Sequence, residues 1–90
     1  MEDILGSRMR LKILRVLTRI SELNISEIAR RVGGNHKTVM EHLKILEEEG
    51  ILQHKTYGRI CLYRFNPNSP KATAIQKFIE EWENMEKLHT

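Results

Sequence analysis

Residues 24–50 decide the fold, and they read NISEIARRVGGNHKTVMEHLKILEEEG. Ser26 is a good N-cap for a short helix over residues 27–32, because its hydroxyl can accept a hydrogen bond from a free N–H of the first turn. Gly33-Gly34 then end this helix in a tight turn. The pattern predicts one short helix that stops abruptly.

A second helix is predicted directly after the glycine turn. Asn35 can cap a helix over residues 36–49, and Gly50 supplies the left-handed residue that ends it. Its apolar residues recur at helical spacing and form an inner face: Val39, Leu43 and Leu46. Two short helices joined by a tight glycine turn are typical of a helix-turn-helix unit.

Before this unit, the spacing of apolar residues predicts a helix over residues 3–20. One arc holds Leu5, Met9, Ile13, Val16, Leu17 and Ile20, and a second arc holds Ile4, Leu11 and Leu14. A short chain can cover one arc with its own core, so a partner subunit is expected on the other. A basic ridge lies between the arcs: Arg8, Lys12, Arg15 and Arg19. This ridge is either a solvated face or an extension of a phosphate-binding surface.

After the unit come two runs rich in β-branched and aromatic residues, 51–56 and 60–66, joined by Tyr57-Gly58-Arg59. They predict a β-hairpin. Ser69 and Pro70 can start a last, strongly amphipathic helix. We therefore expect a mainly α-helical chain with a small β-hairpin (α+β), in the order α-α-α-β-β-α. Residues 1–68 are interpreted as a winged helix-turn-helix domain and residues 69–90 as a C-terminal dimerisation helix of the same compact unit.

Six segments in this order resemble the ArsR-type transcriptional regulators and, more distantly, the MarR-type ones. They are residues 10–17, 28–32, 38–46, 49–52, 57–59 and 63–65. The resemblance covers about residues 8–66. It implies a dimeric regulator of double-stranded DNA, acting as a repressor, that reads the major groove with helix 36–49 and touches the minor groove or backbone with the 51–66 hairpin.

DNA-contacting residues are predicted on both helices of the helix-turn-helix unit and on the hairpin, or wing. The start of a recognition helix faces base edges in the major groove, and the first helix of the unit crosses the backbone. The candidates on the recognition helix are Asn35, His36, Lys37, Thr38, Met40, Glu41 and Lys44. Arg30 or Arg31 is expected on the backbone, and Lys55, Tyr57 and Arg59 on the wing. A solvated face is the competing interpretation for each, and His42 is expected to pack or to hydrogen-bond.

Metal sensing is not expected. The resemblance places the two metal-binding cysteines of the family at the positions held here by Asn24 and Ser26. The last helix offers only His89 with Glu83 and Glu86, and the single Cys61 can form neither an internal disulfide nor a zinc cluster. No cofactor is predicted, and no effector is identified.

Composition is consistent with a binding protein rather than an enzyme. The chain has 90 residues and a net charge of +3, with 12 Lys and Arg against 8 Asp and Glu up to residue 70. This excess is compatible with a nucleic-acid partner. No phosphate loop, nucleophile motif, signal peptide or membrane span is recognised, so a cytoplasmic, nucleoid-associated protein is expected.

A homodimer is predicted because the apolar surface of the last helix exceeds what a small core can cover. The expected interface residues are Leu5, Met9, Ile75, Phe78, Ile79, Trp82 and Met85. Alternatively, the last helix folds back on its own domain. Two other function classes stay open: an architectural chromatin protein with little sequence specificity, and a winged helix that serves only as a protein-interaction module.

Overall fold

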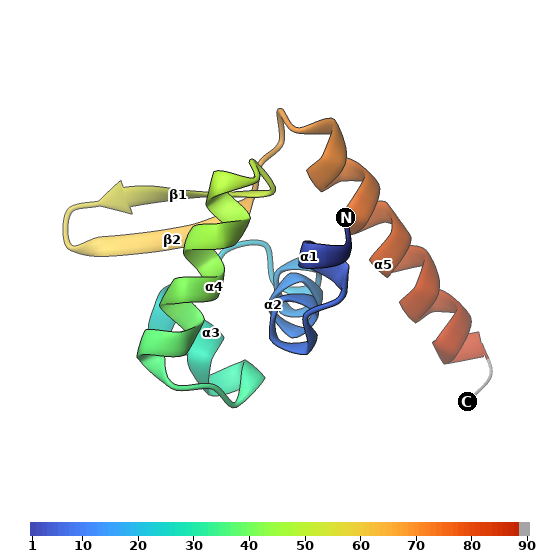
Figure 1. Cartoon of the computed structure of the whole chain (residues 1–90), viewed down its shortest axis with the longest axis horizontal. Helices are drawn as coiled ribbons and strands as arrows, with labels where there is room; N and C mark the ends of the chain where they lie inside the picture. The colour runs from blue at the N-terminus through green and yellow to red at the C-terminus, as the bar shows by residue number, and fades with distance from the viewer. Residues whose placement is uncertain (89–90) are drawn as a thin grey trace.

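A computed structural model describes residues 1–88 of the chain (Figure 1). The described elements are α1 (Glu2–Leu5), α2 (Arg8–Arg19), α3 (Ile25–Val32), α4 (His36–Glu48), β1 (Leu52–Tyr57), β2 (Ile60–Phe65) and α5 (Pro70–Leu88). The chain is mainly helical with one antiparallel hairpin and a C-terminal helix, which confirms the predicted fold class. The hairpin extends to one side of the helices and α5 lies on the other (Figure 1).

The single helix predicted over residues 3–20 is wrong, because the chain forms two helices there. α1 ends at Leu5, and Ser7 starts α2 by accepting a hydrogen bond at Oγ from the backbone N–H of Arg10, 3.3 Å away. A serine directly after Gly6 favours a new N-terminus over a continuous helix. The two apolar arcs therefore belong partly to different helices. Ile4 and Leu14 of the second arc are buried in the core of the same chain, so the expectation that a partner subunit covers this arc is wrong.

The first helix of the helix-turn-helix begins two residues earlier than predicted. Asn24, not Ser26, is its N-cap, and Asn24 Oδ1 accepts from the backbone N–H of Glu27 at 2.9 Å. Asparagine is at least as good a cap as serine, and starting at Ile25 adds an apolar residue to the helix face. α3 ends at Gly33, whose φ of +71° lies in the left-handed region that favours glycine.

The prediction for α4 is confirmed apart from its last residue. Asn35 caps the helix through a 2.8 Å hydrogen bond from the backbone N–H of Thr38. Its predicted inner face, Val39, Leu43 and Leu46, is fully buried. These side chains pack with the buried residues of α2 and α3 in one hydrophobic core.

The hairpin is closed by the two residues Gly58-Arg59, and not by the three that were predicted, since Tyr57 belongs to β1 and pairs with Ile60. At its base, Leu52 pairs with Phe65, and the buried side chains of Tyr63 and Phe65 join the core. An additional bridge between Leu23 and Tyr63 was not predicted: each backbone N–H donates to the other carbonyl, at 3.2 and 2.8 Å. This bridge fastens the hairpin to the segment before α3.

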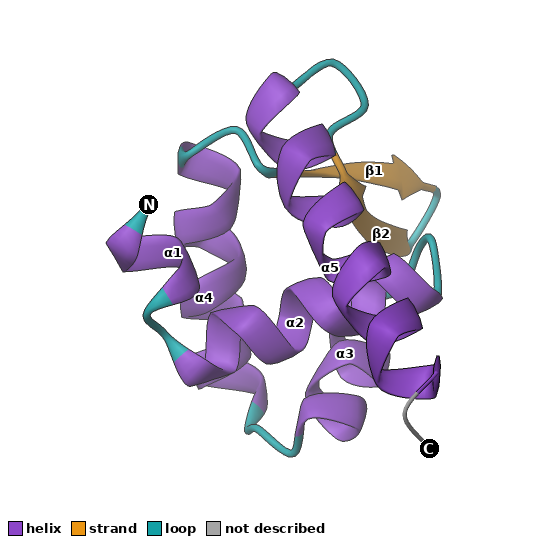
Figure 2. Cartoon of the chain, turned by 90° about the vertical axis from the view of Figure 1, so that its right-hand side faces the viewer, coloured by secondary structure: helices purple, strands orange, loops and turns teal. Residues whose placement is uncertain are grey.

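The last helix packs across α2 and β2, as seen from the α5 side in Figure 2. Ser69 caps it as predicted, because Ser69 Oγ accepts from the backbone N–H of Ala72 at 3.1 Å. Ala72 and Ile79 are buried against the rest of the chain. One side of α5 therefore completes the core of its own domain.

Candidate nucleic-acid interface

The predicted recognition residues of α4 share one exposed face. Their spacing of one, three or four residues keeps them together along the helix, opposite the buried Val39 and Leu43. The exposed members are His36, Lys37, Met40, Glu41 and Lys44. A helix fixed by its inner face can present these side chains to a groove without rearrangement.

Three of the predicted residues are partly engaged within the chain. The Oδ1 atom of Asn35 is used by the helix cap, and Thr38 is only half-exposed. Met40 lies against the hairpin, where its sulfur accepts a 3.7 Å hydrogen bond from the hydroxyl of Tyr63. Burial raises the pKa of Tyr63 to about 12, so this hydroxyl stays protonated and able to donate at neutral pH.

Arg30 and Arg31 occupy different surroundings at the end of α3. Arg30 is 66% exposed, and its Nη2 lies 2.8 Å from a carboxylate oxygen of Glu27. The hydrogen bond from Arg30 lowers the pKa of Glu27. Arg31 is 37% exposed and leans toward α2, where it lines a hollow together with Lys12. Arg30 is therefore the more accessible of the two for a DNA backbone.

The wing residues lie on the exposed part of the hairpin. Lys55 and Tyr57 lie on the same face of the hairpin as their cross-strand partners Leu62 and Ile60. Arg59 lies in the two-residue turn. The other face carries Tyr63 and points to the core. The hairpin thus holds Lys55, Tyr57 and Arg59 away from the core, where a DNA molecule could reach them.

Side-chain contacts fix α4 relative to its neighbours. Of these contacts, the sequence predicted only that His42 packs or forms a hydrogen bond. Arg10 donates from Nε to His42 Nδ1 at 3.2 Å and from Nη1 to the carbonyl of Asp3, which joins α1, α2 and α4. This agrees with the hydrogen-bonding role expected of His42. On the other side, His54 of β1 lies 2.8 Å from a carboxylate oxygen of Glu47. Both contacts join residues distant in sequence or in different elements, so helical periodicity gives no signal for them.

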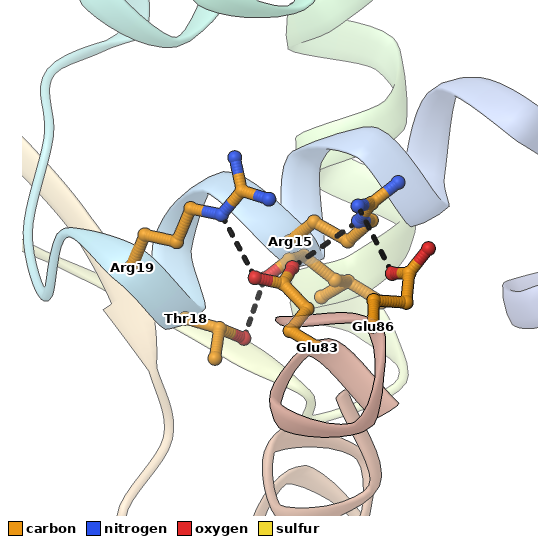
Figure 3. A network of polar contacts seen from close by, with 6 residues as sticks. Arg15, Thr18, Arg19, Glu83 and Glu86 are labelled. Carbon is orange, nitrogen blue, oxygen red and sulfur yellow. Dashed lines mark hydrogen bonds and ion pairs between the residues drawn. The ribbon is translucent and has the colours of Figure 1, made fainter. Parts of the chain in front are cut away.

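Half of the predicted basic ridge is engaged by α5 (Figure 3). Glu83 accepts from Arg15 Nε at 3.2 Å and from Arg19 Nε at 2.9 Å, while Glu86 lies 3.9 Å from Arg15 Nη2. Burial raises the pKa of Glu83, but its hydrogen bonds from Arg19 and Arg15 outweigh this and lower the pKa below its ordinary value. These arginines therefore tether α5 to α2, an arrangement that neither interpretation of the ridge anticipated.

One side of α5 carries exposed apolar side chains. Phe78, Trp82 and Met85 are 56%, 54% and 53% exposed, and the rings of Phe78 and Trp82 stack with centroids 6.2 Å apart. Leu88 follows them at the end of the described helix and is also exposed. This apolar face (Phe78, Trp82, Met85 and Leu88) is uncovered in the single chain.

The remaining predicted interface residues lie elsewhere. Ile79 is only 3% exposed, because it packs into the core of its own chain and has little surface left for a second one. Leu5 and Ile75 are partly buried beside α1, where they line a separate hollow. Met9 lies beneath the glycine turn, with its methyl 3.1 Å from where a Cβ on Gly34 would stand. The structure therefore does not gather all seven residues on one surface.

The positions of the family's metal-binding cysteines have other roles here. Asn24 caps α3 and Ser26 is exposed in its first turn. Among residues 1–88, no three His, Cys, Asp or Glu side chains gather as metal ligands would. His89 lies outside the described residues. No helix in the same range is long and apolar enough to cross a membrane.

Comparison with known proteins gives consistent matches. The family model of bacterial regulatory proteins of the arsR family matches residues 7–54. An arsenical resistance operon repressor of Escherichia coli (strain K12) is 30% identical over 79 residues, which span 88% of this chain and 67% of that protein. The transcriptional repressor PagR of Bacillus anthracis is similar in structure, with a TM-score of 0.72, 27% identity and coverage of 86% of this chain and 85% of that one. A homodimeric winged helix-turn-helix DNA-binding domain from Mycobacterium bovis has a TM-score of 0.75 at 22% identity, over 98% of this chain and 79% of that one.

Proposed function

The chain belongs to the arsR family of bacterial regulatory proteins and is a DNA-binding transcriptional regulator, and from this premise we propose that it represses transcription as a homodimer. In this proposal α4 enters the major groove and the hairpin contacts the adjacent backbone or minor groove. The protein acts by occupying promoter DNA in the cytoplasm and has no catalytic activity of its own.

The exposed face of α4 carries the proposal. His36, Lys37 and Lys44 are exposed on it, while the opposite face is buried in the core. A major groove is wide enough for one helix, and lysines can contact either guanine edges or phosphates there. Glu41 on the same face is expected to accept from a cytosine amino group, since a carboxylate near phosphates is otherwise repelled.

Backbone contacts are assigned to Arg30 and to the wing. Arg30 is the more exposed of the two arginines at the end of α3, and Lys55 and Arg59 project from the outer part of the hairpin. Cationic side chains near phosphates release counterions, so these contacts supply affinity without reading sequence.

The homodimer is proposed from the apolar face of α5. A single winged helix makes few DNA contacts, and two-fold symmetry would place two α4 helices about 34 Å apart, one turn of DNA. Three adjacent side chains that are each more than half exposed form a patch of the kind that marks an interface. The homodimeric domain from Mycobacterium bovis has the same fold, which is compatible with this assembly.

The proposal is tested by measuring binding of the full chain to a DNA operator, with random DNA as competitor, over a series of salt concentrations. Lys37→Ala is expected to weaken operator binding about ten-fold or more, the effect of losing roughly 1–3 kcal/mol at a base edge. Arg59→Ala should weaken binding to all DNA and reduce the salt slope by about one.

Lys77→Ala is the matched control, because Lys77 is an exposed lysine on α5 outside the proposed DNA contacts. Equal affinities for all three variants would refute the assignment of α4 and the wing to DNA. If random DNA competes for the protein as effectively as operator DNA does, the result would instead favour an architectural role.

A further inference from the structure

A hollow of about 220 Å³ lies between α2 and α3, outside the proposed DNA contacts of α4 and the wing. Its apolar lining is Val16 and Val32. Its remaining lining residues are all basic: Lys12, Arg15, Arg19 and Arg31. A second hollow of similar size shares Val16, Arg19 and Arg31 with it, so the two form one groove.

Electrostatic repulsion opposes the close approach of the basic side chains in this groove. Like charges on neighbouring helix turns repel each other, and exposed arginines ordinarily spread into water. Here Glu83 holds Arg15 and Arg19 through their Nε atoms, at 3.2 and 2.9 Å. Figure 3 shows the terminal nitrogens of Arg19 pointing away from Glu83. These donors are thus positioned before any ligand arrives.

The acidic side chains near the groove do not fully neutralise its positive charge. Glu83 and Glu86 pair with the arginines of α2, and Glu27 lies 3.7 Å from Arg31. Lys12 has no hydrogen bond or ion pair among residues 1–88. A compact anion with several acceptor oxygens would satisfy Lys12 and the unused guanidinium donors together.

We propose that the groove between α2 and α3 binds a phosphate-class anion, with Lys12 and Arg31 contacting it from the two helices. A volume of about 220 Å³ is several times the roughly 30 Å³ of a water molecule, so a phosphate or pyrophosphate group fits. Arginine forks and lysine ammonium groups are the side chains that recognise such oxyanions. The apolar Val16 and Ile20 could cover the organic part of a phosphorylated small molecule.

The anion would share its arginines with α5. Glu83 is the carboxylate that already occupies Arg15 and Arg19, so its negative charge opposes a second anion nearby.

The test is isothermal titration calorimetry of the full chain with inorganic pyrophosphate, at constant ionic strength and without divalent metal. We expect saturable binding of one pyrophosphate per chain. Lys12→Gln should weaken it about ten-fold, the size of one charge-assisted contact of roughly 1.4 kcal/mol. Lys77→Gln removes the same charge from an exposed position on α5 and should leave the affinity unchanged.

A second arm distinguishes a free anion from a phosphate of the DNA backbone. For a free anion, Lys12→Gln and Lys77→Gln bind operator DNA equally well. For a backbone phosphate, pyrophosphate does not saturate the groove, and Lys12→Gln lowers DNA affinity and the salt slope by about one. The proposal is overturned if Lys12→Gln matches Lys77→Gln in both arms.

Discussion

Asn24 determines where the helix-turn-helix begins, and it does so at a position where the family's metal-sensing members carry a cysteine. Its side chain accepts from the backbone N–H of Glu27, so the residue is occupied with the helix start. Local pattern alone favoured Ser26, because both residues are good caps two positions apart. The choice between them depends on Ile25, which packs against the core.

We predict that Asn24→Ala lowers the free energy of unfolding by about 1 kcal/mol, the usual cost of losing an N-cap. Ser26→Ala serves as the control and should change stability by less than half of that, since Ser26 is exposed in the first turn of α3. Urea denaturation of both variants measures the difference. The opposite order of stabilities would place the cap at Ser26.

Glu83 makes the attachment of α5 depend on pH. Its pKa is lowered in the folded chain, so the ionised carboxylate stabilises the fold above its ordinary pKa of about 4.5. This contribution is lost as the pH falls through the lower pKa of the folded state. Because Arg15 and Arg19 are 43% and 60% exposed, we expect only about 0.5 kcal/mol at neutral pH.

Glu83→Gln should therefore be less stable than the wild type at pH 7, and the gap should close toward pH 3. Thermal unfolding of both proteins at several pH values, at one protein concentration, measures this difference in stability. Glu80→Gln removes an exposed carboxylate of the same helix and should show no such gap. A gap that persists unchanged at pH 3 would rule out the ion pairs as its cause.

Among the elements, the two helices of the helix-turn-helix, the hairpin and α5 were predictable because their signals are local. Asn35, Gly33 and Ser69 mark helix ends, and Val39, Leu43 and Leu46 mark a buried face. The Leu23–Tyr63 bridge and the contact of Arg10 with His42 join residues far apart in the chain. Such contacts depend on how elements pack, which periodicity does not encode.

The candidate site was predicted only in part for the same reason. Helical spacing placed His36, Lys37 and Lys44 on one face, and the structure has them exposed there. Helical spacing did not predict that the hydroxyl of Tyr63 donates a hydrogen bond to the sulfur of Met40, or that Ile79 is buried within its own chain. Those outcomes depend on the hairpin and on the angle at which α5 crosses α2.

In the whole molecule, α5 lies on the opposite side of the helices from the hairpin (Figure 1). Pairing through the exposed apolar side chains of α5 therefore leaves both wings free. We predict that Trp82→Glu converts the dimer to monomers, because it buries a charge in the centre of the interface. Sedimentation velocity distinguishes the two states. Asn84→Glu adds the same charge at another exposed position of α5 and should leave a dimer; a dimer in both variants would exclude this face.

Selection of bound sequences from random DNA by the full chain, followed by sequencing, tests the proposed dimeric, sequence-specific regulator most directly. Two α4 helices related by two-fold symmetry predict an inverted repeat whose half-sites are centred about 10 base pairs apart. The same repeat should be lost or weakened with Lys37→Ala. Bound sequences without any consensus would contradict sequence-specific regulation, and a consensus without two-fold symmetry would contradict the dimer.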